Sequence, residues 1–288
     1  MTARISHIAT LKKHLQEARK SSQVGFVPTM GYLHEGHLSL IRASRDQGLY
    51  TAVSIFVNPT QFGPNEDLDQ YPRDHDRDFE LAKSAGADLV WYPAHEDLYP
   101  AGHQTMVVPG DLAHKLCGIS RPVFFTGIAT VVLKLFHLIK PHMAFFGEKD
   151  YQQLAIIKRM VRDFLMEIEI QGCATVREAD GLAMSSRNVR LSIEDRDIAL
   201  TLYRSICTAR MRFLEGETDP DTIRGEILSS WPKRLELDYL EFRDPENLEL
   251  VPVLTPTTRI FIGAWLDGVR LIDNASIDST EPLTLHDT

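Results

Sequence analysis

The apolar run at residues 50–57, Tyr-Thr-Ala-Val-Ser-Ile-Phe-Val, constrains the fold of this chain more than any other stretch. Nearly every residue in it is apolar or β-branched, a composition that favours a β-strand. Such a strand is typical of a parallel sheet that helices cover on both faces. The run ends at residues 58–63, Asn-Pro-Thr-Gln-Phe-Gly, where proline and glycine indicate a turn. We therefore expect a buried strand that delivers a polar turn to one edge of a sheet.

The same order of strand, turn and helix recurs along the first part of the chain. It predicts an α/β protein with a Rossmann-like, doubly wound parallel sheet. Further strands are expected at residues 24–27, 88–93, 102–108, 142–146 and 168–170. Helices are expected, from apolar residues at helical spacing, at residues 7–19, 35–45, 73–85, 111–117, 126–139 and 151–164.

The order of predicted helices and strands changes near residue 177. Helices are expected at residues 193–214 and 221–231, and antiparallel strands at residues 237–242, 259–265 and 269–272. We therefore expect two domains. Residues 1–176 would form the Rossmann-like domain, and residues 177–288 a smaller α+β C-terminal domain.

Composition excludes several classes of protein. With 288 residues, 43% of them hydrophobic, the chain can bury a sizeable core. A net charge of −9 argues against a nucleic-acid partner, which would require a basic face. Three cysteines without C-x-x-C spacing indicate a reduced, cytoplasmic setting. We expect no membrane association, because no stretch resembles a signal peptide or approaches the roughly 20 apolar residues of a membrane span.

A candidate anion site follows the strand at residues 24–27. Residues 28–37 read Pro-Thr-Met-Gly-Tyr-Leu-His-Glu-Gly-His, which is a turn leading into a helix. His34 and His37 are three residues apart and share one helical face, so both can approach one phosphate. Gly36 between them lets a flat ring lie against the backbone. The alternative is a pair of surface or capping histidines, whereas zinc is excluded because helical zinc motifs space their histidines four apart.

Two later turns could serve the same phosphate. Residues 147–153, Gly-Glu-Lys-Asp-Tyr-Gln-Gln, also join a strand to a helix. Lys149 lies where a phosphate would sit in such a turn. Asp150 and Gln153, however, have the spacing of a capping box that merely completes the helix. Residues 184–187, Met-Ser-Ser-Arg, offer two hydroxyls and a guanidinium to a triphosphate, or else form an ordinary capped linker.

Each of the remaining polar segments could have either a purely structural role or a functional one. Residues 58–62 place the amides of Asn58 and Gln61 at a strand end, where they could bind a hydroxyl and a carboxylate or simply form a turn. The acidic runs at residues 66–69 and 74–78 are typical of a solvated surface rather than a metal site. The sequence therefore names no protein ligand for a metal ion.

Together these segments resemble the pantothenate synthetase (pantoate–β-alanine ligase) family, part of the nucleotidyl-transferase superfamily named for its His-x-Gly-His element. The resemblance runs from about residue 5 to about residue 275. It implies ATP-dependent condensation of pantoate with β-alanine to pantothenate through a pantoyl adenylate, with release of AMP and pyrophosphate. It also implies a homodimer that serves pantothenate and coenzyme A biosynthesis. We expect Mg²⁺ to arrive with ATP.

The resemblance also implies roles for the matching residues. Charge that develops during adenylyl transfer would be stabilised by His34, His37, Lys149 and Arg187. Substrates would be held by Gln61 (pantoate and β-alanine), Gln153 (pantoate) and Asn58. Contacts to ATP, with adenine meeting the backbone of Val176, are expected from Met30, Gly31, Tyr32, Leu33, His34, Glu35, Gly36, His37, Gly147, Glu148, Lys149, Asp150, Val176, Met184, Ser185, Ser186 and Arg187.

The chain departs from the family pattern in two places. Residues 121–125 read Arg-Pro-Val-Phe-Phe where the family usually has Arg-Pro-Gly-His-Phe, and Ala174 replaces a common proline. Two rival functions stay open. Another adenylyl transferase would release pyrophosphate without needing an amine. A catalytically silent nucleotide-binding regulator would bind ATP and form no AMP from pantoate and β-alanine.

Overall fold

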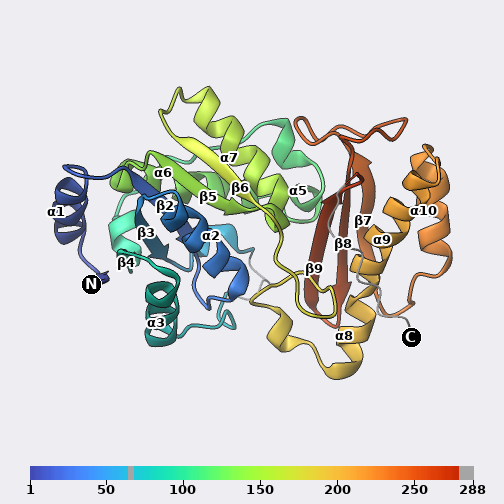
Figure 1. Cartoon of the computed structure of the whole chain (residues 1–288), viewed down its shortest axis with the longest axis horizontal. Helices are drawn as coiled ribbons and strands as arrows, with labels where there is room; N and C mark the ends of the chain where they lie inside the picture. Colours follow the sequence, from blue (N-terminus) through green and yellow to red (C-terminus); the bar gives the residue numbers. More distant parts are fainter. Residues whose placement is uncertain (64–67, 279–288) are drawn as a thin grey trace.

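A six-stranded parallel sheet forms the first part of the molecule, and a three-stranded antiparallel sheet forms the last part (Figure 1). The computed structural model describes residues 1–63 and 68–278. In the parallel sheet the strand order is β1-β4-β3-β2-β5-β6, with bounds β1 (Ala3–Ile5), β2 (Val24–Thr29), β3 (Tyr50–Ile55), β4 (Leu89–Trp91), β5 (Met143–Gly147) and β6 (Glu169–Cys173). The expected doubly wound fold is confirmed.

Helices cover both faces of the parallel sheet. The helices of this part of the chain are α1 (Ile8–Ala18), α2 (Glu35–Asp46), α3 (His75–Ala85), α4 (His95–Leu98), α5 (Cys117–Ser120), α6 (Phe124–Ile139) and α7 (Tyr151–Asp163). In β2, Phe26 belongs to an apolar cluster that includes residues of α1, α6 and α7, whereas Val27 belongs to a cluster with residues of α2 and α3. Ala52 and Val53 of β3 divide in the same way, because successive side chains of a strand point to opposite faces. Burial on both faces is why these strands read as continuous apolar runs.

The strand order places the candidate turns at a topological switch point. β2 pairs in parallel with β3 on one side and with β5 on the other. The chain therefore runs outward from β2 to β3 and β4, then returns to add β5 and β6 on the opposite side. Doubly wound sheets bind ligands in the crevice at the carboxyl ends of two such strands. Here those ends carry the turn at residues 30–34 and the 3-10 turn Glu148–Asp150.

The C-terminal part has its own sheet and its own core. Its elements are α8 (Ile193–Ala199), α9 (Thr201–Leu214), α10 (Pro220–Ser229), β7 (Glu236–Arg243), β8 (Arg259–Leu266) and β9 (Val269–Ser276). Figure 1 shows α9 and α10 on the side of this sheet that faces away from the parallel sheet. Buried residues between 182 and 277 form a separate apolar cluster. A domain boundary near residue 176 stays a prediction, which this separate cluster favours.

The observed strands differ from the expected ones in two places. β1 has no counterpart in the sequence prediction, because three residues are too few for a periodic pattern and its partner β4 is distant in sequence. The strand expected at residues 102–108 is wrong: within the described residues this segment is irregular. Its Val107 N–H donates to Oγ1 of Thr130 in α6 at 2.9 Å, so a helix side chain replaces a strand partner.

Two expected helices are divided. The helix expected at residues 111–117 is a 3-10 turn, Asp111–His114, followed by α5, because Leu116 adopts a left-handed φ of +46° between them. The helix expected at residues 193–214 is split into α8 and α9 at Leu200, whose ψ of −14° departs from α-helical geometry. Within the described residues, no helix combines the length and the apolar character that crossing a membrane requires.

Candidate active site

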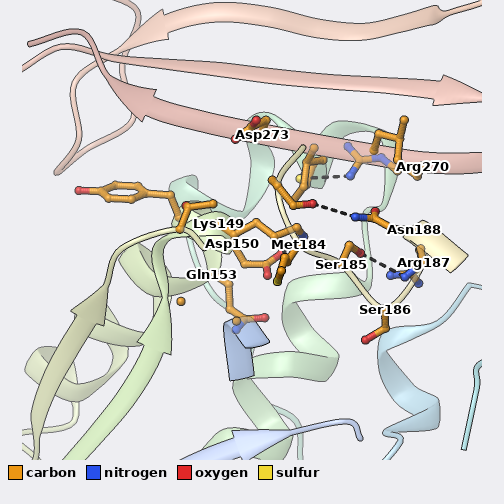
Figure 2. A pocket seen from close by; sticks show the side chains of 18 of the residues that line it. Lys149, Asp150, Gln153, Met184, Ser185, Ser186, Arg187, Asn188, Arg270 and Asp273 are labelled. Carbon is orange, nitrogen blue, oxygen red and sulfur yellow. Dashed lines mark hydrogen bonds and ion pairs between the residues drawn. The ribbon is translucent and has the colours of Figure 1, made fainter. Parts of the chain in front are cut away.

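A cavity of about 430 Å³ opens at the carboxyl ends of β2 and β5 and reaches β9 of the second sheet. Most of the residues that the sequence singles out line it: Met30, His34, Gly36, His37, Gln61, Gly147, Lys149, Asp150, Gln153, Val176, Met184, Ser185, Ser186 and Arg187. Figure 2 shows Lys149 and Gln153 on one side of this cavity, and Ser185 and Arg187 on the other. Three segments that are distant in sequence therefore meet at one place.

A buried carboxylate holds the turn after β2. Gly31 has a φ of +89°, a left-handed value that favours glycine. Asp78 of α3 accepts the backbone N–H groups of Tyr32 and Leu33, each at 2.7 Å. Because α3 turns Asp78 inward until it is only 1% exposed, the sequence interpretation of residues 74–78 as solvated surface is wrong for this residue. Burial raises the pKa of Asp78, and the two N–H groups oppose that rise.

His34 and His37 cap α2 through their Nδ1 atoms. Nδ1 of His34 accepts the N–H of Gly36 at 3.2 Å, and Nδ1 of His37 accepts the N–H of His34 at 3.3 Å. The capping interpretation is therefore correct, but it does not compete with ligand binding. A neutral ring that accepts at Nδ1 carries its proton at Nε2 and can donate it elsewhere. Gly36 leaves room for this arrangement, since a Cβ there would lie 2.9 Å from Cε1 of His34.

Burial favours the neutral form of both imidazoles. Burial, followed by the positive charge of Lys149, lowers the pKa of His34 from 6.5 to about 4. Burial also lowers the pKa of His37 well below its usual value, with smaller effects from His34 and Lys149. The sequence leaves open whether these side chains act as neutral donors or as cations. The structure favours two uncharged N–H donors whose ring centroids are 4.1 Å apart.

The 3-10 turn Glu148–Asp150 follows β5 and presents Lys149 to the cavity; we call this turn the Lys149 corner. Nζ of Lys149 lies 3.6 Å from Oδ1 of Asp150. The capping-box interpretation of Asp150 and Gln153 is wrong, because within the described residues the Asp150 side chain makes no capping hydrogen bond to α7. The structural glutamine is instead Gln152, which is 5% exposed and accepts the N–H of Cys117 at 3.0 Å. Gln153 is therefore free of a capping role and faces the cavity.

The segment with the two serines is tied to the turn after β2. Oγ of Ser186 donates to the carbonyl oxygen of Tyr32 at 3.2 Å, across 154 residues of sequence. Oγ of Ser185 accepts the N–H of Arg187 at 3.3 Å, which shapes the turn locally. An ordinary linker does not account for the long-range contact. The segment at residues 184–187 is thus a part of the cavity wall.

Gln61 is oriented by a buried asparagine. Nδ2 of Asn58 donates to Oε1 of Gln61 at 3.2 Å and to the carbonyl oxygen of Gly127 at 3.1 Å. Its Oδ1 accepts the hydroxyl of Tyr99 at 2.9 Å. Asn58 is 1% exposed and lies behind the cavity wall, so its position does not support the expected contact with substrate. It holds Gln61, which does face the cavity.

The departure from the family at residues 121–125 changes the wall beside Gln61. Phe124 lines the cavity where the family's histidine would stand, and Val123 points to solvent with 56% exposure. The guanidinium of Arg121 lies 3.5 Å from the centroid of the Phe124 ring. Nη2 of Arg121 donates to the carbonyl oxygen of Gln61 at 3.3 Å. The phenyl ring therefore braces a cation next to Gln61, at the position where the family resemblance leads us to expect an imidazole.

Several residues expected to touch ATP are placed elsewhere. Leu33 is fully buried in the core below α2, and Glu35 pairs with Arg42 on the surface. Glu148 turns away to pair with Arg259 at 3.0 Å. Within the described residues, those expected at ATP that do not line the cavity are Gly31, Tyr32, Leu33, Glu35 and Glu148. None of these five residues lines the wall, and their expected contact with ATP stays a prediction.

Other cavity residues carry no local sequence signal. They are contributed by distant elements, and among them are Tyr71, Cys117, Tyr239, Arg270, Asp273 and Asn274. No group of three or more histidine, cysteine, aspartate or glutamate side chains in the described part of the chain could hold a metal ion. Of the acidic run at residues 66–69, Glu66 and Asp67 lie outside the described residues.

Comparison with known proteins gives a consistent result. Residues 3–276 match the Pantoate-beta-alanine ligase family. A pantothenate synthetase from Thermotoga petrophila is 48% identical over 273 residues, which cover 94% of this chain and 98% of that protein. One from Geobacter sulfurreducens is 47% identical over 273 residues, covering 94% and 96% of the two chains.

Solved structures agree with the sequence relatives. The crystal structure of pantothenate synthetase from Thermus thermophilus superposes with a TM-score of 0.91 at 43% identity, covering 96% of this chain and 99% of that one. A pantoate-beta-alanine ligase from Francisella tularensis, complexed with beta-gamma ATP and beta-alanine, gives a TM-score of 0.80 at 35% identity, with 97% and 99% coverage.

Proposed function

The chain belongs to the pantoate–β-alanine ligase family, and from this premise we propose that its cavity condenses pantoate with β-alanine in two steps, through a pantoyl adenylate. ATP is a substrate of this family of ligases. One observation carries the proposal. Two neutral imidazoles, Lys149 and the segment at residues 184–187 converge on a single cavity, beside a glutamine that is held in place.

In the first step, a carboxylate oxygen of pantoate attacks the α-phosphorus of ATP. The bond from that phosphorus to the bridging oxygen breaks, and pyrophosphate leaves. Negative charge grows on the phosphoryl oxygens, and we assign its stabilisation to His34, His37 and Lys149, with Arg187 at the departing pyrophosphate. Donors that are fixed in advance in a water-poor site are effective because they need no reorganisation during the reaction.

In the second step, the amine of β-alanine attacks the acyl carbon of the pantoyl adenylate. The bond from that carbon to the AMP oxygen breaks, AMP leaves, and the amine proton passes to water. We assign the holding of pantoate and β-alanine to Gln61, and of pantoate also to Gln153. Adenine would meet the backbone of Val176. Alignment of amine and acyl carbon is the main contribution of the protein here, since the adenylate is already activated.

Magnesium fits this site as a companion of ATP. When bound, Mg²⁺ would neutralise charge on the phosphates of ATP, where it usually keeps several water ligands and uses few protein carboxylates. The described residues offer no multidentate carboxylate cage, which agrees with that mode. Asp150 is the carboxylate closest in sequence to Lys149 on the cavity wall, and we propose it as an outer contact of the hydrated ion.

We further propose that the protein is a cytoplasmic homodimer; the homodimer rests on the family resemblance, and the cytoplasmic setting rests on the three cysteines without C-x-x-C spacing. Light scattering on the purified protein would then give twice the chain mass of 32.6 kDa. A mass of 32.6 kDa across a hundredfold dilution series would instead describe a monomer.

Isotope transfer tests the two-step chemistry directly. Pantoate labelled with ¹⁸O in its carboxylate is incubated with ATP, Mg²⁺ and β-alanine, and the products are read by mass spectrometry. An adenylate intermediate transfers one labelled oxygen from the carboxylate to AMP. Pantothenate formed together with unlabelled AMP would rule out the adenylate, while the ligase activity itself would stand.

Omitting substrates one at a time separates the rival functions. A ligase forms AMP and pantothenate only when ATP, pantoate and β-alanine are all present. An adenylyl transferase of another kind would release pyrophosphate with a phosphate acceptor and no amine. A silent nucleotide-binding regulator would bind ATP in calorimetry and form no AMP with any of these substrates.

A further inference from the structure

Two consecutive polar residues on β9, Asp273 and Asn274, are almost completely buried at 3% and 4% exposure. Strand β9 belongs to the C-terminal sheet, and Figure 2 shows it passing over the cavity with Asp273 and Arg270 on it. Buried polar side chains are costly unless they are hydrogen-bonded, so the partners of this pair indicate what it does.

Asn274 holds the corner that presents Lys149. Its Nδ2 donates to the carbonyl oxygen of Glu148 at 3.0 Å and to that of Lys149 at 2.8 Å. Its Oδ1 accepts Nη1 of Arg259, whose Nη2 pairs with Oε2 of Glu148 at 3.0 Å. The Arg259 guanidinium also lies 3.9 Å from the centroid of the Tyr151 ring, at the start of α7. Both the Nδ2 and the Oδ1 atoms of Asn274 are therefore hydrogen-bonded, and these contacts fix the orientation of its side-chain amide.

Asp273 contacts Arg177, at the start of the segment that forms the opposite wall of the cavity. Its carboxylate accepts Nη1 and Nη2 of Arg177 at 2.7 and 3.1 Å, a two-point contact of the strong, charge-assisted kind. Arg177 begins the segment that leads to Ser185 and Arg187. Nη1 of Arg177 also donates to the carbonyl oxygen of Gly181 at 3.1 Å, which shapes the intervening loop.

Adjacent residues of one strand thus anchor two cavity segments that come from different parts of the chain. The corner at Lys149 extends the parallel sheet, whereas the segment from Arg177 enters the C-terminal part. We propose that Asp273 and Asn274 are positioning residues, which fix the Lys149 corner and the segment at residues 184–187 relative to each other so that both reach one triphosphate. This inference rests on the proposed function of the cavity.

The contacts show why the side chain of Lys149 needs such support. Its Nζ lies 3.6 Å from the carboxylate of Asp150, which is too long for a strong hydrogen bond. The position of Nζ therefore depends on where the backbone of the corner lies. Asn274 sets that backbone position through two carbonyl oxygens, and a displacement of about 1 Å can cost about a hundredfold in rate.

The variants Asn274→Ala and Asn274→Asp test the proposal. The aspartate keeps the size and the acceptor for Arg259 but loses both donations to the corner. We expect each variant to lower the rate of pantoate-dependent pyrophosphate release by about tenfold to a hundredfold. Ile223→Val is the matched control, since Ile223 is fully buried in the C-terminal core away from these contacts, and its substitution should leave the rate unchanged.

A double-mutant cycle with Lys149→Ala distinguishes positioning from general destabilisation. If Asn274 acts through Lys149, then Asn274→Ala in the Lys149→Ala background causes little further loss. The same fold-loss in both backgrounds would overturn the proposal, and so would a wild-type rate for Asn274→Asp. Should Asn274→Ala fail to fold, as judged by circular dichroism, Asn274→Asp carries the cycle alone.

The second arm tests Asp273. Asp273→Asn keeps the shape and removes the charge that fixes Arg177, so we expect the KM for ATP to rise several-fold, and little further change when Arg187→Ala is already present. An unchanged KM would remove Asp273 from the proposal. Failure of the proposed function would look different, since the wild-type protein would then form no pantothenate under any condition.

Discussion

Substituting Asp78 by alanine should loosen the turn that presents the two histidines. The carboxylate of Asp78 accepts two backbone N–H groups, each at 2.7 Å, and is 1% exposed. Alanine at this position would leave both N–H groups without this acceptor. Hydrogen bonds to a charged group contribute about 1.5–3 kcal/mol each. The two together suggest about 3–6 kcal/mol. Removing a buried charge returns part of this sum, because charge burial is itself costly, and we expect a net loss of about 2–4 kcal/mol.

The loss is measurable as a shift in melting temperature. Unfolding entropy of about 2.1 cal/mol/K per residue gives about 0.6 kcal/mol/K for a chain of 288 residues. A loss of about 2–4 kcal/mol therefore lowers Tm by about 3–7 °C, as read by differential scanning calorimetry. Because Asp78 fixes the turn that leads to His34, kcat should also fall, by about a hundredfold if the imidazoles move by about 1 Å.

Asp76→Ala provides the control on the same helix. The Asp76 side chain is 88% exposed, and its pair with Arg4 at 2.6 Å is a surface ion pair. Such pairs contribute little, so Tm and kcat should stay close to those of the wild type. An Asp78→Ala protein that melts within about 1 °C of wild type, with wild-type kcat, would refute the reasoning about the buried carboxylate.

Three further outcomes follow from the same geometry. Replacing His37 or Lys149 by alanine should leave the fold intact and lower the rate of pyrophosphate release by about a hundredfold to a thousandfold, as measured in a coupled assay. The pKa of His34 is lowered to about 4, so between pH 6.5 and 4 the unfolded chain binds a proton at this residue and the folded chain does not. The free energy of unfolding, measured by urea titration, should therefore fall by up to about 3 kcal/mol as the pH is lowered from 6.5 to 4. His34→Gln should remove this part of the pH dependence. Asn58→Ala should raise the KM for pantoate and lower kcat, because it releases Gln61, while Kd for ATP from calorimetry stays near the wild-type value.

The sequence predicts the central architecture because the information is local. Apolar runs such as residues 24–27 and 50–57 report burial on both faces, and the turns that follow them mark the binding edge of the sheet. The observed strand order confirms that prediction. The roles proposed for the individual cavity residues stay predictions, although most of those residues share one cavity.

The contacts that support the cavity could not be predicted in the same way. Asp78 lies in a run of charges that resembles any solvated helix, and only its partners at residues 32 and 33 explain its burial. Asn274 acts on a corner about 125 residues away in sequence. Neither position carries a periodic or compositional signal in the sequence. The role of each side chain depends on which distant backbone groups the fold places next to it.

Histidine as the capping residue of α2 would allow capping and the proposed nucleotide binding to take place at one turn. Serine, threonine or aspartate would also accept the first N–H groups of the helix. A serine or threonine that caps in this way would reach no farther than the helix end, and an aspartate would place a negative charge beside a triphosphate. A neutral imidazole accepts at Nδ1 and still has a donor at Nε2 on the opposite side of its ring. His34 and His37 use Nδ1 for the backbone, and burial keeps both rings uncharged. The same two side chains can therefore cap the helix and, in the proposed function, also donate to the nucleotide.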